Sequence, residues 1–124
     1  MKVEIPNGEI VDKITILSIK MSQIKDEEKL KNVKKEYDCL MKFLEKIGIN
    51  EESFLYQRLF IINRELWDIE DNIRNKEKKK EFDEEFIFLA RKVYITNDER
   101  CRIKKEINIK TGSDFVEEKS YEEY

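Results

Sequence analysis

Long stretches of this chain repeat apolar residues at intervals of three and four, with few residues that would interrupt a helix. The clearest stretch runs from Glu51 to Lys79, where one stripe holds Leu55, Leu59, Ile62, Leu66, Ile69 and Ile73. This spacing is that of one face of an α-helix, whereas a half-buried strand would alternate at every second residue. The 124 residues include only three glycines and one proline, which favours long helices joined by few turns. The pattern therefore predicts an all-α fold.

Three further stretches carry the same kind of apolar stripe. They are the segments around Ile10 to Ile24, Leu30 to Ile47 and Phe86 to Ile107. Asp26 and Asp83 are suited to begin helices because their carboxylates accept hydrogen bonds from free N–H groups, and Asn7 or Gly8 and Asn50 are expected to begin the other two. Gly48 and Gly112 are suited to end helices. Four helices joined by short turns predict a single domain over residues 1–124, folded as an antiparallel up-down four-helix bundle.

Both ends of the chain are expected to lie outside these helices. Met1 to Pro6 alternates apolar and polar residues, and Pro6 disfavours a helix before it, so a short extended arm is expected. The last twelve residues are acidic but include Phe115, Val116, Tyr121 and Tyr124. A disordered tail would not need four large apolar residues. We therefore expect the C-terminal tail to dock on the bundle, at least through Phe115 and Val116.

A polar site is predicted where the seam of the last helix is interrupted. Arg100 occupies a position where another apolar residue is expected, with Asn97, Lys104 and Asn108 beside it. The helix from Glu51 to Lys79 carries a second stripe, which suggests a central helix and holds Tyr56, Phe60, Asn63, Trp67, Glu70 and Arg74. Folding the chain about its turns brings a polar set to one end of the bundle, namely Glu9, Asp12, Lys13, Asn63, Arg100 and Lys104. Arg100 would anchor this pocket, with Glu9, Asp12, Glu70, Glu117 and Glu118 as candidate carboxylate partners.

Composition narrows the classes of function. The sequence has no histidine, which excludes histidine-dependent catalysis and histidine metal sites. The net charge is −3 with the two signs interspersed, so no basic surface for nucleic acid is expected. No apolar run is long enough to cross a membrane, and a cytoplasmic protein is expected. Cys39 and Cys101 are far apart in the sequence and are expected to be reduced residues in or near the core. No cofactor and no metal are expected.

Four sequence blocks together carry a resemblance to a known family. They are GEIVDKITIL (residues 8–17), ELWDIEDNIR (residues 65–74), FIFLARKVYITNDER (residues 86–100) with the following Ile107 and Asn108, and GS (residues 112–113) with VEEKSY (residues 116–121). In this order the blocks resemble an uncharacterised bacterial family of small helical proteins, whose members occur beside or fused to glycosyltransferase and surface-polysaccharide genes. The resemblance nominates as motif positions Glu9, Asp12, Lys13, Trp67, Glu70, Arg74, Arg91, Asn97, Arg100, Glu117, Lys119 and Tyr121. It implies no mechanism, because gene context is an association.

Several functions remain open from the residues alone. The first is a non-enzymatic binding module for a partner protein or a carbohydrate-pathway component. Ile16 and Ile19, which lie off the main seam, predict that the protein also self-associates as a homodimer. The second is a small helical enzyme or sensor for an anionic metabolite such as a phosphate, sugar nucleotide or dicarboxylate, bound by arginine and lysine side chains. The third is a magnesium-dependent nucleotide pyrophosphatase that uses Glu9-x-x-Asp12 and Glu65-x-x-Asp68. The sequence favours the first.

Overall fold

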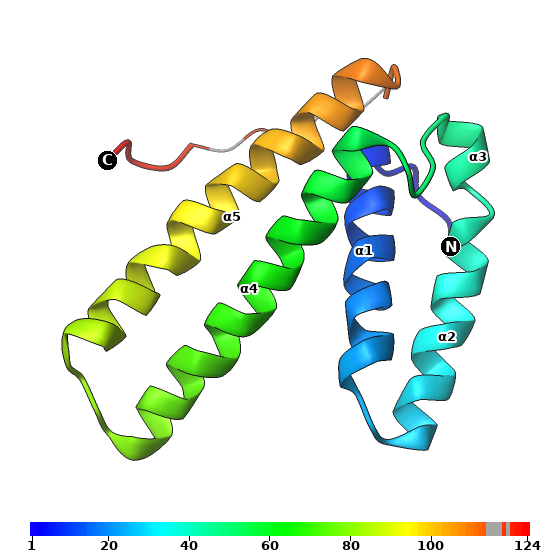
Figure 1. The fold of residues 1–124 in the computed structure, drawn as a ribbon. Coiled ribbons are helices and arrows are strands. Elements are labelled where there is room, and N and C mark those ends of the chain that lie inside the picture. Colours follow the sequence, from blue (N-terminus) through cyan, green and yellow to red (C-terminus); the bar gives the residue numbers. More distant parts are fainter. Residues whose placement is uncertain (114–117, 119) are drawn as a thin grey trace.

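The computed structural model describes residues 1–113, 118 and 120–124, and within these residues every regular element is a helix. The helices are α1 (Asn7–Gln23), α2 (Glu27–Met41), α3 (Leu44–Ile47), α4 (Phe54–Lys79) and α5 (Glu84–Lys110) (Figure 1). Four are long and α3 is a single turn. The predicted all-α fold with four long helices that alternate in direction is confirmed.

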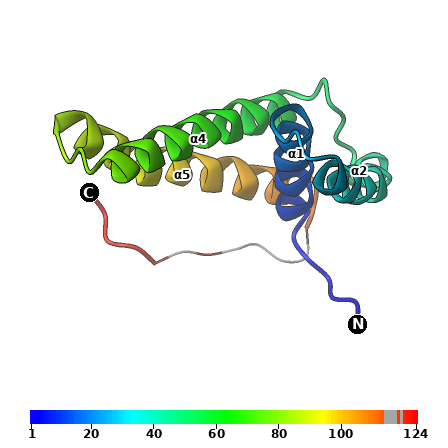
Figure 2. The ribbon, with the colours of Figure 1, turned by 90° about the horizontal axis from the view of Figure 1, so that it is seen from below.

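The long helices form two antiparallel hairpins that diverge from a shared end. The α1–α2 and α4–α5 hairpins lie close together where α1 begins and α5 ends, and they separate towards their turns (Figures 1 and 2). Helix α1 packs against α2, α4 and α5, whereas α4 packs mainly against α5 and α1. The central helix is therefore α1 and not the stretch from Glu51 to Lys79 that the two stripes suggested. The distal half of the α4–α5 hairpin extends beyond the part that α1 covers.

The core lies where the two hairpins meet. Val11, Ile14, Leu59 and Ile107 are fully buried there. Helix α2 contains no fully buried residue and covers the core with half-buried side chains such as Tyr37 and Leu40. The sequence placed both cysteines in or near the core, but Cys39 is exposed because it faces away from α1, and Cys101 is half-buried.

The predicted helix ends are confirmed at Asp26 and Asp83 but not at Gly48 and Asn50. The carboxylates of Asp26 and Asp83 accept the backbone N–H of Lys29 and Phe86, both at 3.0 Å. Gly48 adopts the expected left-handed conformation at φ 84°, but it follows α3, because the second helix ends at Met41. Helix α4 begins at Phe54 with Ser53, not Asn50, at its N-cap. The Asn50 side chain instead accepts the N–H of Glu52 at 2.8 Å and forms a turn before the helix.

The start of α1 is capped by residues far away in the sequence. Asn7 or Gly8 was expected at the N-cap of this helix, but Pro6 occupies that position and provides no side-chain hydrogen bond. The N–H of Gly8 donates to Oδ1 of Asn108 at 2.5 Å, and the N–H of Asn7 donates to Oγ of Ser113 at 3.1 Å. Two of the free N–H groups of α1 are therefore satisfied by the last turn of α5 and the segment that follows it, while the N–H of Glu9 donates to the carbonyl of Pro6. Residues 1–6 precede the helix in neither helix nor strand, as an extended arm would.

The described part of the C-terminal tail runs back along α5 and contacts it, as expected for a docked tail. The Tyr124 hydroxyl donates to Oδ2 of Asp98 at 2.5 Å, and its ring meets Tyr94 edge to face with centroids 5.2 Å apart. Glu118 forms an ion pair with Lys105 at 3.2 Å. Phe115 and Val116, which the sequence expected to dock, lie outside the described residues.

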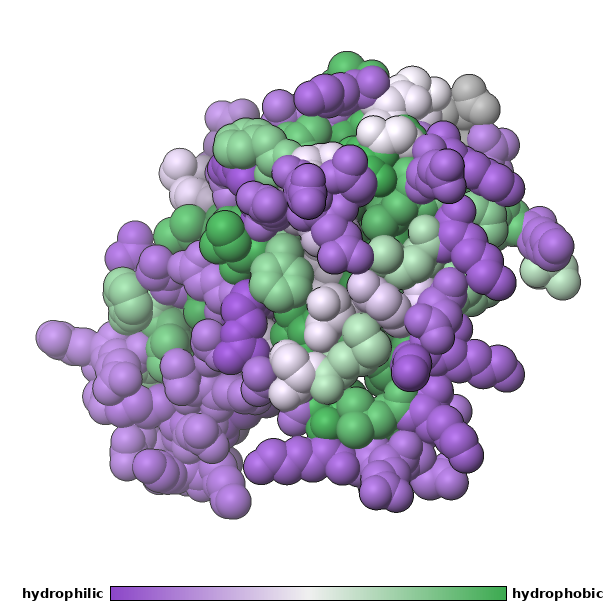
Figure 3. Space-filling model, turned by 45° about the vertical axis from the view of Figure 1, so that its right-hand side comes forward, coloured by the Kyte–Doolittle hydropathy of each residue, from purple (hydrophilic) through white to green (hydrophobic). Residues whose placement is uncertain are grey.

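The tip of the α4–α5 hairpin is dominated by charge. Hydrophilic side chains gather over it at the lower left of Figure 3. Lys76 lies within 3.1 Å of carboxylate oxygens from Glu81, Asp83 and Glu85, which raise the pKa of its ammonium group, Asp83 first. Lys76, the first lysine of the basic run at the end of α4, is therefore balanced by acids of the turn and of α5. Among the described residues, no helix is both long and apolar enough to span a bilayer.

Candidate functional site

A buried polar network joins α1, α4 and α5 next to the core. Asp12 on α1 accepts hydrogen bonds from Nε and Nη2 of Arg100 on α5, at 2.9 and 2.5 Å. The Asn63 amide on α4 donates to Asp12 at 2.9 Å and to the Thr15 hydroxyl at 2.8 Å. Nη1 of Arg100 reaches Oδ1 of Asn97 at 3.3 Å. Helices α1, α4 and α5 therefore each contribute polar side chains to one connected set.

The ion pair between Asp12 and Arg100 is largely buried and therefore helps to hold the fold together. The Asp12 side chain is 4% exposed and that of Arg100 is 26% exposed. A carboxylate removed from water is costly unless it is paired and hydrogen-bonded, and two bonds from one guanidinium satisfy it well. The hydrogen bonds from Arg100 to Asp12 also raise the pKa of the guanidinium. Arg100 interrupts the apolar seam of α5 because α1 brings a carboxylate to that position.

A second contact fixes the start of α1 against α5. Nζ of Lys104, which is almost buried, lies 2.5 Å from a carboxylate oxygen of Glu9. A Cβ added to Gly8 would come within 2.4 Å of the Lys104 carbonyl oxygen, so the two backbones are too close for any larger residue. Helix α1 therefore covers the face of α5 that carries Lys104.

An open groove begins beside the network and continues along the distal half of α4 and α5. It has a volume of about 750 Å³. Three helices and the tail contribute its lining: Ile16, Asn63, Leu66, Trp67, Glu70, Asp71, Arg74, Val93, Tyr94, Asn97, Asp98, Arg100, Tyr121, Glu122 and Tyr124. The divergence of the two hairpins leaves this face of α4 and α5 without a covering helix (Figure 2). The groove is therefore a product of the way the hairpins are arranged.

The groove combines aromatic rings with an excess of negative charge. Its described lining holds four carboxylates, from Glu70, Asp71, Asp98 and Glu122, and two guanidinium groups, from Arg74 and Arg100. Both guanidinium groups are engaged, because Nε of Arg74 lies 3.1 Å from Glu70 and Arg100 is held by Asp12. The arrangement can offer aromatic faces and hydrogen-bond acceptors to a ligand.

The structure brings together five of the six residues that the turn geometry placed at one end of the bundle. Asp12, Asn63 and Arg100 form one network, and Glu9 pairs with Lys104. Lys13 is the exception. It faces α2, where its ammonium group lies 3.3 Å from Glu36.

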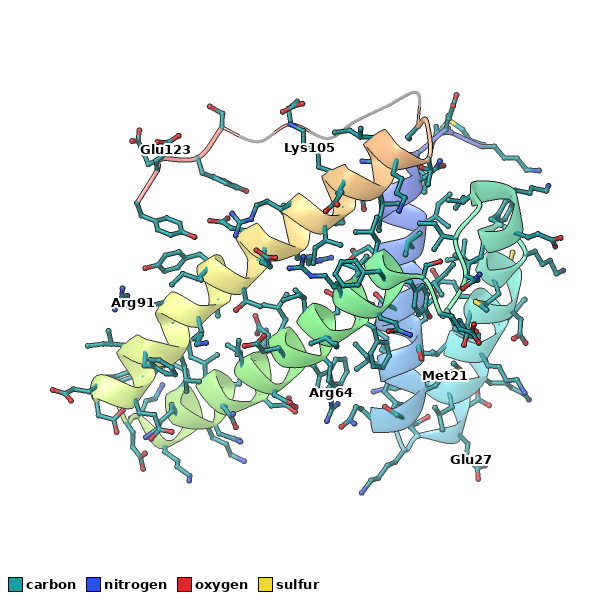
Figure 4. The ribbon with its side chains drawn as sticks, turned by 45° about the horizontal axis from the view of Figure 1, so that its top comes forward. Met21, Glu27, Arg64, Arg91, Lys105 and Glu123 are labelled. Carbon is teal, nitrogen blue, oxygen red and sulfur yellow. The ribbon has the colours of Figure 1, made fainter. Side chains whose placement is uncertain are left out.

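The other nominated residues separate into three groups. Trp67, Glu70, Arg74, Asn97 and Tyr121 line the groove. Arg91 is exposed on α5 (Figure 4) and is not among the residues that line the groove. Glu117 and Lys119 lie outside the described residues. Of the partners suggested for Arg100, Asp12 is correct, whereas Glu9, Glu70 and Glu118 pair with Lys104, Arg74 and Lys105.

Sequence reasoning missed several residues of the site. Thr15 is fully buried and accepts the Asn63 amide, and Asp71, Tyr94 and Asp98 line the groove. Tyr94 lies three residues before Asn97, so extending the polar stripe of the last helix backwards would have found it, and Asp98 lies one turn after Tyr94 on the same face. Thr15 gives no such signal, because a buried threonine on an apolar face resembles any small core residue.

The carboxylates proposed for magnesium are used elsewhere. Asp12 is paired with Arg100, Glu65 lies 3.8 Å from Lys92, and Asp68 lies 3.5 Å from Arg64. Over the described part of the chain, no three metal-ligating side chains converge. The pyrophosphatase hypothesis therefore has no carboxylate cluster on which to rest.

The chain belongs to a family of unknown function (DUF6165), whose model matches residues 1–124. The four sequence blocks thus correctly indicated an uncharacterised family. No curated protein and no solved structure matches the chain.

Proposed function

We propose that this DUF6165 chain is a non-enzymatic binding module that holds its ligand in the groove between α4, α5 and the tail. The observation that carries the proposal is the groove itself, about 750 Å³ in volume and lined by aromatic rings, carboxylates and amides. Sites for small molecules are usually preformed concave surfaces of this kind, apolar with a few polar groups. The neighbouring network of Asp12, Asn63 and Arg100 supports the same view, because it fixes the helices that form the walls.

Binding is favoured over catalysis by how the charged groups are used. The sequence has no histidine, and the strongest candidate for a reactive cation, Arg100, is held by a buried carboxylate. The alternative of an enzyme or sensor for an anionic metabolite has less support. Both arginines of the groove are paired, and its remaining charges are negative and would repel a phosphate or a dicarboxylate.

The module's wider role is proposed to be accessory to glycosyltransfer or surface-polysaccharide synthesis. Aromatic rings that stack on sugar faces, with acceptors for hydroxyl groups nearby, are compatible with a carbohydrate-pathway ligand. A cytoplasmic location and a homodimer or partner protein belong to the same proposal. The apolar residues Ile87 and Phe88, exposed on the distal hairpin, offer a surface for such a partner.

The binding proposal can be tested through the single tryptophan of the sequence, Trp67, which lines the groove. Its fluorescence and the melting temperature would be followed with maltotriose, uridine diphosphate glucose, phosphate, succinate and choline. At least one compound should change both in a saturable way, and the change should disappear in a Tyr94→Ala/Asp71→Ala variant, in which two exposed groove side chains are removed. The absence of any saturable change would contradict the proposal.

The accessory role needs a test in the organism that encodes the chain. Replacing the native copy by the same double variant should lower the amount of surface glycan while leaving the protein level unchanged. A glycan of unchanged amount and composition would reject the accessory role.

A further inference from the structure

We infer that the groove takes an organic cation, a ligand that carries an ammonium group, and this inference rests on the proposed function of the groove as a binding site. Three features of the groove support the inference: carboxylates without an ion-pair partner among the described residues, apolar side chains in the same lining, and aromatic rings.

The unbalanced charges of the groove are negative. Among the residues the structure describes, no lysine or arginine lies within ion-pair distance of Asp71, Asp98 or Glu122. Arg102 is close enough to interact with Asp98 electrostatically, but it is paired with Glu99. Both arginines of the lining already have acidic partners. Asp98 accepts the Tyr124 hydroxyl at 2.5 Å, but a neutral phenol leaves the charge of the carboxylate in place. A cationic ligand would supply the missing counter-charge.

The surroundings of these carboxylates strengthen that attraction. Ile16, Leu66 and Val93 contribute apolar side chains to the same lining. A cleft with charges of one sign and walls of low dielectric constant concentrates the electric field and attracts ions of the opposite sign. The same field would repel an anion that entered the groove.

Aromatic rings decide in favour of an organic cation over a metal ion. Trp67, Tyr94 and Tyr124 line the groove, and the last two pack edge to face with an interplanar angle of 80°. The faces of such rings attract ammonium groups, and tryptophan does so most strongly. A metal ion would instead require several converging ligands, and over the described part of the chain no three carboxylate or cysteine side chains converge. Rings and separated carboxylates together match an alkylammonium group.

The test compares two compounds that differ only in charge. Choline and its neutral isostere 3,3-dimethylbutan-1-ol would each be titrated into the full chain, with Trp67 fluorescence and calorimetry as readouts, and spermidine would serve as a longer cation. Choline should bind at least about tenfold more tightly than the neutral alcohol, because the isostere has no charge to interact with the rings and carboxylates. Equal binding of choline and the alcohol, or no binding of either cation, would overturn the inference.

Two substitutions in the groove should change the affinity for a cation in opposite directions. Asp71→Asn should weaken binding of the tighter cation about fivefold by removing one attractive charge, whereas Arg74→Gln should strengthen it by releasing Glu70. Asp38→Asn makes the same charge change on the exposed face of α2 and should leave binding unchanged. A site for an anion would show the reverse changes in affinity, and that result would reject the inference.

The same titrations separate failure of this inference from failure of the proposed function. Saturable binding of maltotriose or uridine diphosphate glucose without binding of either cation would preserve a binding module and reject the cation. Absence of binding by every compound would reject both.

Discussion

The buried network and the open groove contain the same chemical groups in opposite states. In the network, Asp12 and Arg100 form a carboxylate–guanidinium pair with exposed fractions of 4% and 26%. In the groove, Glu70 and Arg74 form a pair of the same chemistry, with exposed fractions of 46% and 79%. The first pair joins helices 88 residues apart in sequence, and the second joins neighbouring turns of α4. Burial, and not residue type, therefore decides which pair stabilises the fold and which is available to a ligand.

The largest expected effect comes from breaking the buried pair. Arg100→Met should lower the free energy of unfolding by about 3–5 kcal/mol, because it leaves the Asp12 charge buried without its cation. Chemical denaturation of the wild type and the variant measures this difference. The double variant Asp12→Leu/Arg100→Met, which removes both charges, should recover most of the loss. A single variant as stable as the wild type would mean that water reaches Asp12.

An intermediate effect is expected at the close contact between α1 and α5. Gly8→Ala should cost about 1–3 kcal/mol, because the new methyl group would meet the backbone carbonyl of Lys104, which cannot move aside without shifting the helix. Thermal denaturation gives the size of the change. Lys31→Ala on the exposed face of α2 is the control and should stay within about 0.5 kcal/mol of the wild type. Equal melting temperatures for the two variants would refute the predicted clash.

The smallest effect is expected from the pair in the groove. Arg74→Met should change the free energy of unfolding by no more than about 0.5 kcal/mol, since an exposed pair four residues apart on one helix contributes little. The same denaturation curves in 1 M sodium chloride sharpen the comparison. At this salt concentration the screening length is about 3 Å, so the effect of Arg74→Met should disappear while that of Arg100→Met persists. A large, salt-independent loss at Arg74 would make the groove part of the structural core.

The prediction of self-association loses part of its basis. Ile19 is buried within the chain itself, and Ile16 lines the groove, so neither residue requires a second copy to cover it. The exposed large apolar residues of the described chain include a group on the distal hairpin, at Phe82, Ile87 and Phe88. Sedimentation of wild type beside a Phe88→Asp variant would show whether that surface joins two copies.

The sequence by itself determined the helices and most of their ends. A helix depends on spacings of three and four residues, and a cap such as Asp26 or Asp83 depends on a residue three positions away, so both can be read locally. The sequence also marked Arg100 as a cation in an apolar seam that needs a carboxylate. It could not select among Asp12, Glu9 and Glu70, because the height of a residue in a bundle does not fix the direction in which its helix faces.

Only the tertiary structure decided what surrounds each polar residue. Asn108 and Ser113 cap a helix about 100 residues earlier in the chain, where Gly8 allows close approach, and no local pattern encodes such a contact. The angle between the two hairpins is likewise set by the packing of α1 against both α4 and α5. With this arrangement of the hairpins, Asp12 is buried and Asp71 stays exposed in the groove. The two carboxylates have the same charge and differ only in which helix lies above them.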